Sequence, residues 1–162
     1  VEFSILHPET EDYARQAQLP PNAMGCVLRV SNGHQSALLA ADIEQAQEAR
    51  LVRTQAEQLR ADVLLVPHHG SKTSSSAAFL DAVQPRFAWV QSGYRNRFGH
   101  PAATVLARYD ARGIAVQDSP HCGAMQWESA HPEAMQCERD VQRHYWQHQV
   151  PQPARSVIGA RD

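Results

Sequence analysis

Residues 62–80 read DVLLVPHHGSKTSSSAAFL, and this stretch decides the fold. It begins with a short, nearly continuous apolar run that ends at a proline, which is typical of a strand buried on both faces. Serines 74–76 then precede apolar residues at Phe79, Leu80 and Val83, a pattern that predicts a helix. The stretch therefore predicts a buried strand, a polar loop and a helix in succession.

The segments upstream of this strand complete a β-α-β unit. Residues 26–30 and 36–40 are predicted to form two strands joined by an Asn-Gly turn, a strong hairpin signal. Residues 44–60 have apolar side chains at helical spacing, which predicts an amphipathic helix. Because a crossover of this length favours parallel pairing, we expect the strands at 36–40 and 62–66 to be parallel.

The whole pattern predicts an α/β fold in which a mixed sheet has helices on its outer face. Further strands and helices are predicted at residues 2–7, 87–90, 101–112, 114–116 and 124–127. Beyond residue 128 the composition shifts to His, Gln and Pro. We therefore expect one domain at residues 1–128, and at residues 129–162 a C-terminal helix near 138–149 followed by a flexible tail.

Length and composition limit the class of protein. The chain has 162 residues, a formal net charge of -2 and 43% hydrophobic residues, which suits one folded core and excludes a disordered chain. No apolar run approaches the roughly 18 residues of a membrane helix, and the first residues do not resemble an export signal. Lys72 is the only lysine, so arginine, which binds phosphate in a bidentate way, supplies nearly all the positive charge.

The cysteines Cys26, Cys122 and Cys137 are odd in number and widely spaced. This spacing contains no CxxC pair, and it predicts no disulfide framework. The redox compartment of the protein is therefore not identified by its cysteines.

Side chains with metal-binding chemistry follow two strands of the predicted β-α-β unit. Asp42 follows the first strand, and His68 and His69 follow the second. If the strands are parallel, these side chains emerge at the same carboxyl edge of the sheet, where α/β proteins bind ligands. A carboxylate and an imidazole are ligands that Zn or Mn takes in hydrolytic sites.

Two interpretations of these residues remain open. Asp42 can cap the helix at 44–60, and the two histidines can be loop residues that hydrogen-bond to the backbone. A ligand site is favoured by the loop that follows, because Gly70 permits a positive φ and hydroxyl groups lie beside a helix start. The predicted result is an anion cradle for phosphate, formed by Ser71, Thr73 and Ser74.

Residues 62–80, together with residues 91–109, which read QSGYRNRFGHPAATVLARY, resemble the C-terminal metallo-β-lactamase-like domain of ComEC-type competence proteins. These proteins are channels that import DNA in natural transformation. The resemblance covers most of the chain, from the loop before CVLRV through LLAADIE to HCGAM and RDVQRHYW. It implies that the chain is the C-terminal portion of an αβ/βα sandwich.

The resemblance also implies roles for individual residues. Asp42 is expected to bridge two divalent metal ions, Zn or Mn, in the complete domain, with His69 as a terminal ligand. His68 is expected either to contact the metal ligands without binding metal itself or to donate a hydrogen bond to phosphate. The sequence does not decide which of the two histidines is the metal ligand. Asp42, His68 and His100 form the implied catalytic set.

The loop before the helix at 101–112 supplies the remaining candidates. His100 either caps this helix or donates to the scissile phosphate, and the sequence leaves both roles open. Arg95, Asn96 and Arg97 are expected to contact the DNA backbone, alongside the cradle hydroxyls.

The chain also departs from the pattern of the family. The family's HxDxDH cluster, which supplies most metal ligands, has no counterpart here, so we expect the chain to begin downstream of it. Ala41 stands where the family has glycine before the bridging aspartate, and residues 22–25 read NAMG where it has Asn-Asn-x-Ser. These departures allow a degenerate site, and we expect this chain alone to bind metal weakly and to have little nuclease activity.

The function implied by the resemblance is metal-dependent hydrolysis of DNA phosphodiesters during DNA uptake. The expected partners are DNA and the remainder of the channel protein, namely the upstream half of the domain and its transmembrane segments, with no dinucleotide cofactor. The domain is expected on the periplasmic side of the inner membrane.

Two alternatives remain. The first is a DNA-handling module without catalysis, and the second is a phosphorylcholine-esterase-like hydrolase of the same fold. The upstream HxDxDH cluster distinguishes a hydrolase from the module, and the NRFGHP loop favours DNA over a small ester.

Overall fold

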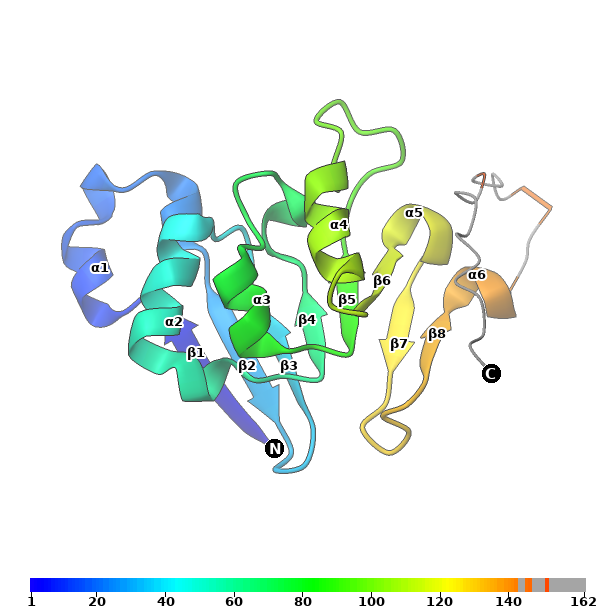
Figure 1. The fold of residues 1–162 in the computed structure, drawn as a ribbon, viewed down its shortest axis with the longest axis horizontal. Coiled ribbons are helices and arrows are strands. Elements are labelled where there is room, and N and C mark those ends of the chain that lie inside the picture. Colours follow the sequence, from blue (N-terminus) through cyan, green and yellow to red (C-terminus); the bar gives the residue numbers. More distant parts are fainter. Residues whose placement is uncertain (143–144, 147–150, 152–162) are drawn as a thin grey trace.

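The computed structural model describes residues 1–142, 145–146 and 151. Within them, six strands form one sheet in the order β1-β2-β3-β4-β5-β6, and two more form a separate hairpin (Figure 1). In chain order the strands are β1 Glu2–His7, β2 Val27–Ser31, β3 Ser36–Leu39, β4 Val63–Leu65, β5 Phe87–Val90, β6 Ala115–Asp118, β7 Met125–Trp127 and β8 Met135–Cys137.

The six-stranded sheet changes from antiparallel to parallel pairing at β3. β1, β2 and β3 are antiparallel neighbours, whereas β3, β4, β5 and β6 pair in parallel. Parallel strands need crossover connections, and the helices α2 Gln45–Leu59, α3 Ala77–Val83 and α4 Ala103–Asp110 provide them. These helices lie in a row over one face of the sheet (Figure 1). The predicted α/β class, the mixed sheet and the parallel pairing of β3 with β4 are confirmed.

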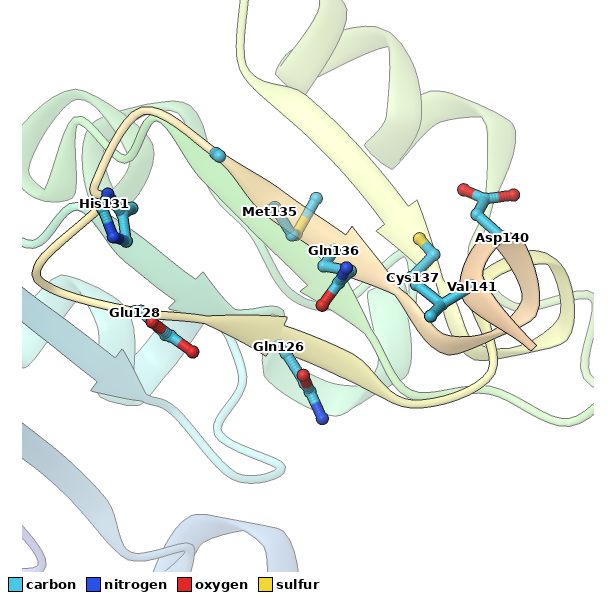
Figure 2. Close-up of a pocket in the computed structure, with 9 residues that line it drawn as sticks. Gln126, Glu128, His131, Met135, Gln136, Cys137, Asp140 and Val141 are labelled. Carbon is cyan, nitrogen blue, oxygen red and sulfur yellow. The ribbon is translucent and has the colours of Figure 1, made fainter.

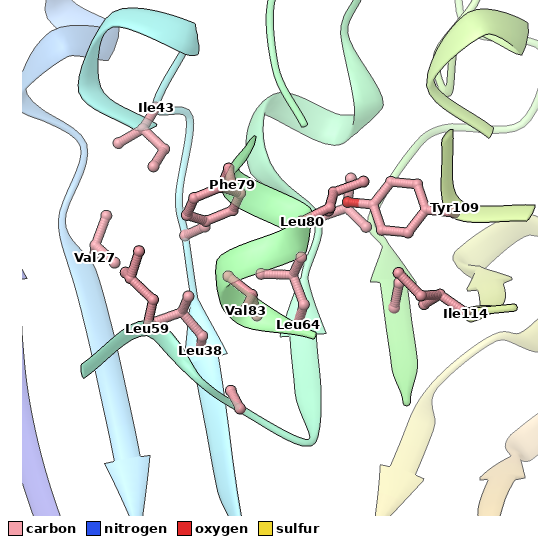
Figure 3. Close-up of a cluster of buried hydrophobic side chains, with 14 of the residues drawn as sticks. Val27, Leu38, Ile43, Leu59, Leu64, Phe79, Leu80, Val83, Tyr109 and Ile114 are labelled. Atoms are coloured by element: carbon pink, nitrogen blue, oxygen red, sulfur yellow. The ribbon is translucent and has the colours of Figure 1, made fainter. Parts of the chain in front are cut away.

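The hydrophobic core lies between these helices and the sheet. Leu38 of β3 and Leu64 of β4 are fully buried, in one cluster with Phe79 and Leu80 of α3 (Figure 3). Burying each such side chain contributes about 1.5–3 kcal/mol. The same cluster includes Val27, Ile43, Leu59, Val83, Tyr109 and Ile114.

The opposite face of the sheet is less completely covered by the described residues. Leu39, Leu65 and Trp89 share one register across β3, β4 and β5, and all three are half-buried. Leu64, the neighbour of Leu65 in the chain, lies on the helix side and is fully buried. β4 is therefore fully covered on the face toward the helices and partly covered on the opposite face.

Three short helices occupy the segment between β1 and β2. They are α1 Thr10–Ala14, η1 Gln16–Gln18 and η2 Pro21–Met24. Arg50 of α2 holds α1 in place, because its guanidinium donates to Asp12 Oδ1 and Glu9 Oε2, both at 2.6 Å. Burial raises the pKa of Asp12, but the hydrogen bonds and the charge of Arg50 outweigh burial and lower it overall. The contact joins residues far apart in the chain, so local sequence does not reveal it.

The C-terminal helix is shorter than predicted in the part that is described. α6 spans Glu138–Val141, and Gln142 has extended backbone angles, with φ -123° and ψ 103°. The predicted continuation at 143–144 and 147–149 and the predicted tail at 152–162 lie outside the described residues. No helix in the described part of the chain has the length and apolar character needed to cross a membrane.

A disulfide joins Cys122 to Cys137, which corrects the expectation that the cysteines form no disulfide framework. Cys122 ends α5 Ser119–Cys122, and Cys137 ends β8. β7 and β8 pair so that Met125 lies opposite Cys137, which returns the chain to within reach of Cys122. The hairpin therefore decides the pairing, and Cys26 stays exposed and free.

Removal of the disulfide tests its contribution to the hairpin. We expect the double variant Cys122→Ala and Cys137→Ala to lose about 3 kcal/mol of local stability, because the bond closes a loop with a sequence separation of 15. Amide hydrogen exchange should accelerate in β7 and β8 and stay unchanged in β4. Cys26→Ala is the matched control, and equal exchange in both variants would contradict the expectation.

Candidate functional site

The candidate site lies at the carboxyl edge of the parallel part of the sheet. Asp42 follows β3, His68 and His69 lie in η3 Pro67–Gly70 after β4, and His100 lies in the loop after β5. His69 Nε2 is 3.5 Å from Asp42 Oδ1. Both side chains are about half exposed, at 49% and 45%, so a solute can reach them. The predicted convergence of Asp42 and His69 is confirmed.

The orientation of His69 is determined by a backbone contact. Its Nδ1 lies 2.6 Å from the carbonyl oxygen of Gln91. Because a carbonyl oxygen only accepts, Nδ1 is the donor, and the other ring nitrogen, Nε2, faces Asp42. A second-nitrogen contact of this kind is typical of histidines that ligate metals.

His68 faces a different set of partners. Its Nδ1 is 3.2 Å from Glu44 Oε1, and its Nε2 is 3.4 Å from Asn22 Nδ2. Thr73 Oγ1 also lies 3.5 Å from His68 Nδ1. Both nitrogens of His68 therefore have partners other than Asp42, whereas Nε2 of His69 faces Asp42. Glu44 and Asn22 were not predicted as site residues, although Glu44 lies two positions from Asp42.

Strained backbone conformations bring these groups together. Ala41, His68 and His69 have φ of 48°, 49° and 54°, a region that favours glycine, and the N–H of His68 donates to the carbonyl of Ala41 at 2.9 Å. The glycine that the resemblance leads us to expect at position 41 suits this φ. Strain of this kind persists only where surrounding contacts enforce it.

The HHG and GHP segments pack directly against each other. A Cβ placed on Gly70, which has φ of 79°, would lie 2.7 Å from Pro101 Cβ, so only glycine fits there. The N–H of Ala102 donates to the carbonyl of Gly70 at 2.9 Å. This close approach brings the ring of His100 to 6.1 Å from that of His68, measured between centroids.

His100 has a buried nitrogen that lacks a partner. Its Nδ1 is buried and makes no hydrogen bond in the described part of the chain, and no side chain caps the start of α4. The capping role left open by the sequence is therefore not observed. Burial lowers the pKa of His100, and the electrostatic influence of His68 and His69 lowers it further. The shift favours the neutral ring, which has one donor and one acceptor nitrogen.

The predicted anion cradle is arranged differently from the expectation. Ser74 is fully buried, and its hydroxyl donates to the carbonyls of Pro67 and Ser71 at 2.8 and 3.0 Å. Ser71 is also buried, and its Oγ lies 3.1 Å from Thr73 Oγ1. Of the three hydroxyls, Thr73 is the one that reaches His68. The serine hydroxyls mainly hold the loop.

An internal carboxylate occupies the position predicted for phosphate. Glu48 of α2 is fully buried and accepts from the N–H groups of Ser75 and Ser76 at 2.5 and 2.8 Å. Burial raises the pKa of Glu48 despite these hydrogen bonds and the nearby charge of Arg108. Arg108 donates to the carbonyls of Ser74 and Ser75, so the loop is held from both sides.

Glu48→Gln tests this contact. An amide offers a donor where the carboxylate offered a second acceptor, so we expect a loss of about 1–3 kcal/mol in the free energy of unfolding. Because the pKa of Glu48 is raised on folding, the wild type should lose stability as pH rises from the ordinary glutamate range through the raised pKa. The Gln variant does not titrate at this position. The difference in the free energy of unfolding between the wild type and the variant, measured by urea unfolding, should therefore become smaller as pH rises through that range. A difference independent of pH would contradict the assignment.

The loop after β5 contains three residues predicted to contact DNA, Arg95, Asn96 and Arg97, and their environments differ. Asn96 organises the loop, since its Nδ2 donates to the carbonyl of His100 at 2.6 Å and its Oδ1 accepts from the N–H of His100 at 3.0 Å. The two arginines are exposed. Their contact with DNA stays a prediction.

The donor set is incomplete for a metal centre in the described residues. Among them, no three His, Cys, Asp or Glu side chains are placed to hold one ion. Asp42 and His69 supply one oxygen and one nitrogen donor, which are suitable ligand types for Zn or Mn. The part of the chain that is described therefore offers two of the several ligands that a hydrolytic metal site needs.

A separate hollow of about 510 Å³ lies beside the β7–β8 hairpin (Figure 2). Its walls are formed by both hairpin strands and α6. None of the residues predicted for the site lines it. The candidate chemistry is therefore confined to the sheet edge.

Comparison with known proteins adds homology to this geometry. No family model matches the chain. The chain is 35% identical over 147 residues to "Competence protein ComA" of Neisseria gonorrhoeae, which covers 91% of this chain and 20% of that protein. The chain is a distant homologue of competence proteins.

Two further relatives support this homology. "ComE operon protein 3" of Bacillus subtilis is 32% identical over 78% of this chain, and "Recombination protein 2" of Haemophilus influenzae is 37% identical over 63% of it. The matched segments span 16% and 13% of those two proteins. The chain thus corresponds to a small part of each larger relative.

Proposed function

We propose that this chain is the C-terminal portion of a metallo-β-lactamase-like domain that hydrolyses DNA phosphodiesters, within a larger protein of DNA uptake. The observation that carries the proposal is the 3.5 Å approach of His69 to Asp42 at the carboxyl edge, with His69 oriented by Gln91. Homology to competence proteins supports DNA as the substrate.

Asp42 and His69 are the residues that would hold divalent metal. Zn or Mn bound there would polarise the phosphate and lower the pKa of a bound water. The remaining ligands of the proposed two-metal site would come from outside the described residues, from the other half of the domain.

The neighbouring side chains have supporting roles in this proposal. His68 is held by Glu44 and Asn22, with Thr73 beside it, so it would support the metal ligands without binding metal itself. His100 is partly exposed and its ring centroid lies 6.1 Å from that of His68, so it would contact the substrate beside the metal ligands. Donors placed in advance where charge develops stabilise the transition state.

The proposed compartment is the periplasmic side of the inner membrane. The Cys122–Cys137 disulfide supports this location, because such bonds form and persist in oxidising compartments. The proposed partners are DNA and the rest of the larger protein.

A second candidate function is a DNA-handling module without catalysis. It is favoured by the two-donor set of the described residues and by alanine at position 41. In this case the edge would bind phosphate without cleaving it.

Nuclease assays of the larger protein, with its upstream half present, test the proposal. We expect Asp42→Ala and His69→Ala each to reduce metal-dependent DNA cleavage at least about a hundredfold, because each removes a metal ligand. His34→Ala is a matched control, since His34 is exposed in the β2–β3 turn at the opposite edge of the sheet. DNA binding without cleavage under any divalent metal would favour the module instead.

The chain alone should behave differently from the larger protein. We expect calorimetric titration with Zn or Mn to give weak binding and cleavage to be negligible, because two donors do not hold two ions. Tight binding of two ions per chain, lost in Asp42→Ala, would show that the other half of the domain is dispensable.

A further inference from the structure

The loop that follows β5 exposes two aromatic side chains beside the candidate site. Phe98 is 67% exposed and Tyr94 is 40% exposed. Phe98 stacks on His100 with a centroid distance of 5.7 Å and an interplanar angle of 16°. The exposed ring of Phe98 is therefore continuous with the histidines of the sheet edge.

Each aromatic ring has an arginine over it. The guanidinium carbon of Arg95 lies 5.2 Å from the Tyr94 ring centroid, and that of Arg97 lies 4.8 Å from the Phe98 ring centroid. Residues 91–101 include no acidic residue. The loop therefore presents flat apolar faces together with positive charge, the combination that binds single-stranded nucleic acid.

The loop is held in one conformation without a ligand. Asn96 Nδ2 donates to the carbonyls of Gly93 and His100, at 3.1 and 2.6 Å, and the N–H of Gly99 donates to the carbonyl of Asn96 at 3.1 Å. A preorganised loop loses less conformational entropy on binding. The rings are thus already displayed for a partner.

A cavity of about 380 Å³ adjoins the loop. The loop forms one wall, including Tyr94, Arg95 and His100, and the opposite wall includes Asp118 at the end of β6 and His121 of α5. Its volume lies at the small end of the range for ligand pockets, roughly 300–1,000 Å³. The cavity extends the candidate site along the sheet edge from β5 to β6.

We propose that residues 92–100 bind single-stranded DNA by stacking unpaired bases on Phe98 and Tyr94, with Arg95 and Arg97 at the phosphates. The choice of DNA rests on the proposed function. A single strand is specified because base faces are accessible only when bases are unpaired. An exposed cation–π contact is weaker than base stacking, so a base displaces the guanidinium of Arg97, which then reaches the backbone.

Fluorescence anisotropy with a labelled single-stranded oligonucleotide tests the proposal, using the full chain with EDTA present to prevent cleavage. We expect Phe98→Ala to weaken binding about tenfold, Tyr94→Ala to weaken it similarly, and Phe98→Trp to preserve it. Phe3→Ala is the matched control, because Phe3 is 68% exposed and lies on β1 at the far side of the sheet. Circular dichroism checks that each variant folds.

Two further probes separate stacking from charge. A strand of equal length without bases should bind more weakly and should not respond to Phe98→Ala. A duplex of the same sequence should also be insensitive to this substitution. No binding of the single strand by the wild-type chain, or equal loss of affinity for the strand without bases, would overturn the proposal.

The binding experiment tests the stacking loop separately from the proposed hydrolysis. If the larger protein cleaves no DNA while Phe98→Ala still weakens strand binding, the proposed hydrolysis fails and the stacking loop stands. If cleavage persists and Phe98→Ala leaves strand affinity unchanged, the stacking loop fails alone.

Discussion

The carboxylate of Glu48 accepts hydrogen bonds from the backbone of Ser75 and Ser76 inside the protein, and the candidate site depends on this contact. The loop that it holds includes His68 and His69, whose positive φ angles cost free energy. Glu48 belongs to α2, so the contact joins the first crossover helix to the histidine loop and to the start of α3. Burying a carboxylate is costly, and two short charge-assisted hydrogen bonds offset part of that cost.

A second constraint is the close packing of the two loops that follow β4 and β5. Gly70 lies so near Pro101 that no side chain fits between them, and the backbone of the two loops is hydrogen-bonded there. This packing explains why the HHG and GHP segments occur together: one positions His68 and the other positions His100. A side chain at position 70 would clash with Pro101 and force the two loops apart.

Different strands supply different kinds of side chain to the carboxyl edge of the sheet. The ends of β3 and β4 supply the half-exposed Asp42 and His69, whereas the end of β5 supplies arginines and aromatic rings. Parallel strands make this arrangement possible, because each crossover returns the chain to the same edge. The proposed cleavage site and the proposed strand-binding loop would lie at this one edge, in a chain that is homologous to competence proteins.

The sequence by itself determined the α/β class, the parallel pairing of β3 and β4, and thus the meeting of Asp42 with the His68-His69 pair, because apolar periodicity and crossover length are local properties. Which histidine faces the aspartate was decided by the tertiary structure, through the Gln91 carbonyl that orients His69. The burial of Ser74 and the Cys122–Cys137 pairing were decided in the same way. These features depend on contacts between segments distant in the chain, and hydrophobic periodicity carries no information about such contacts.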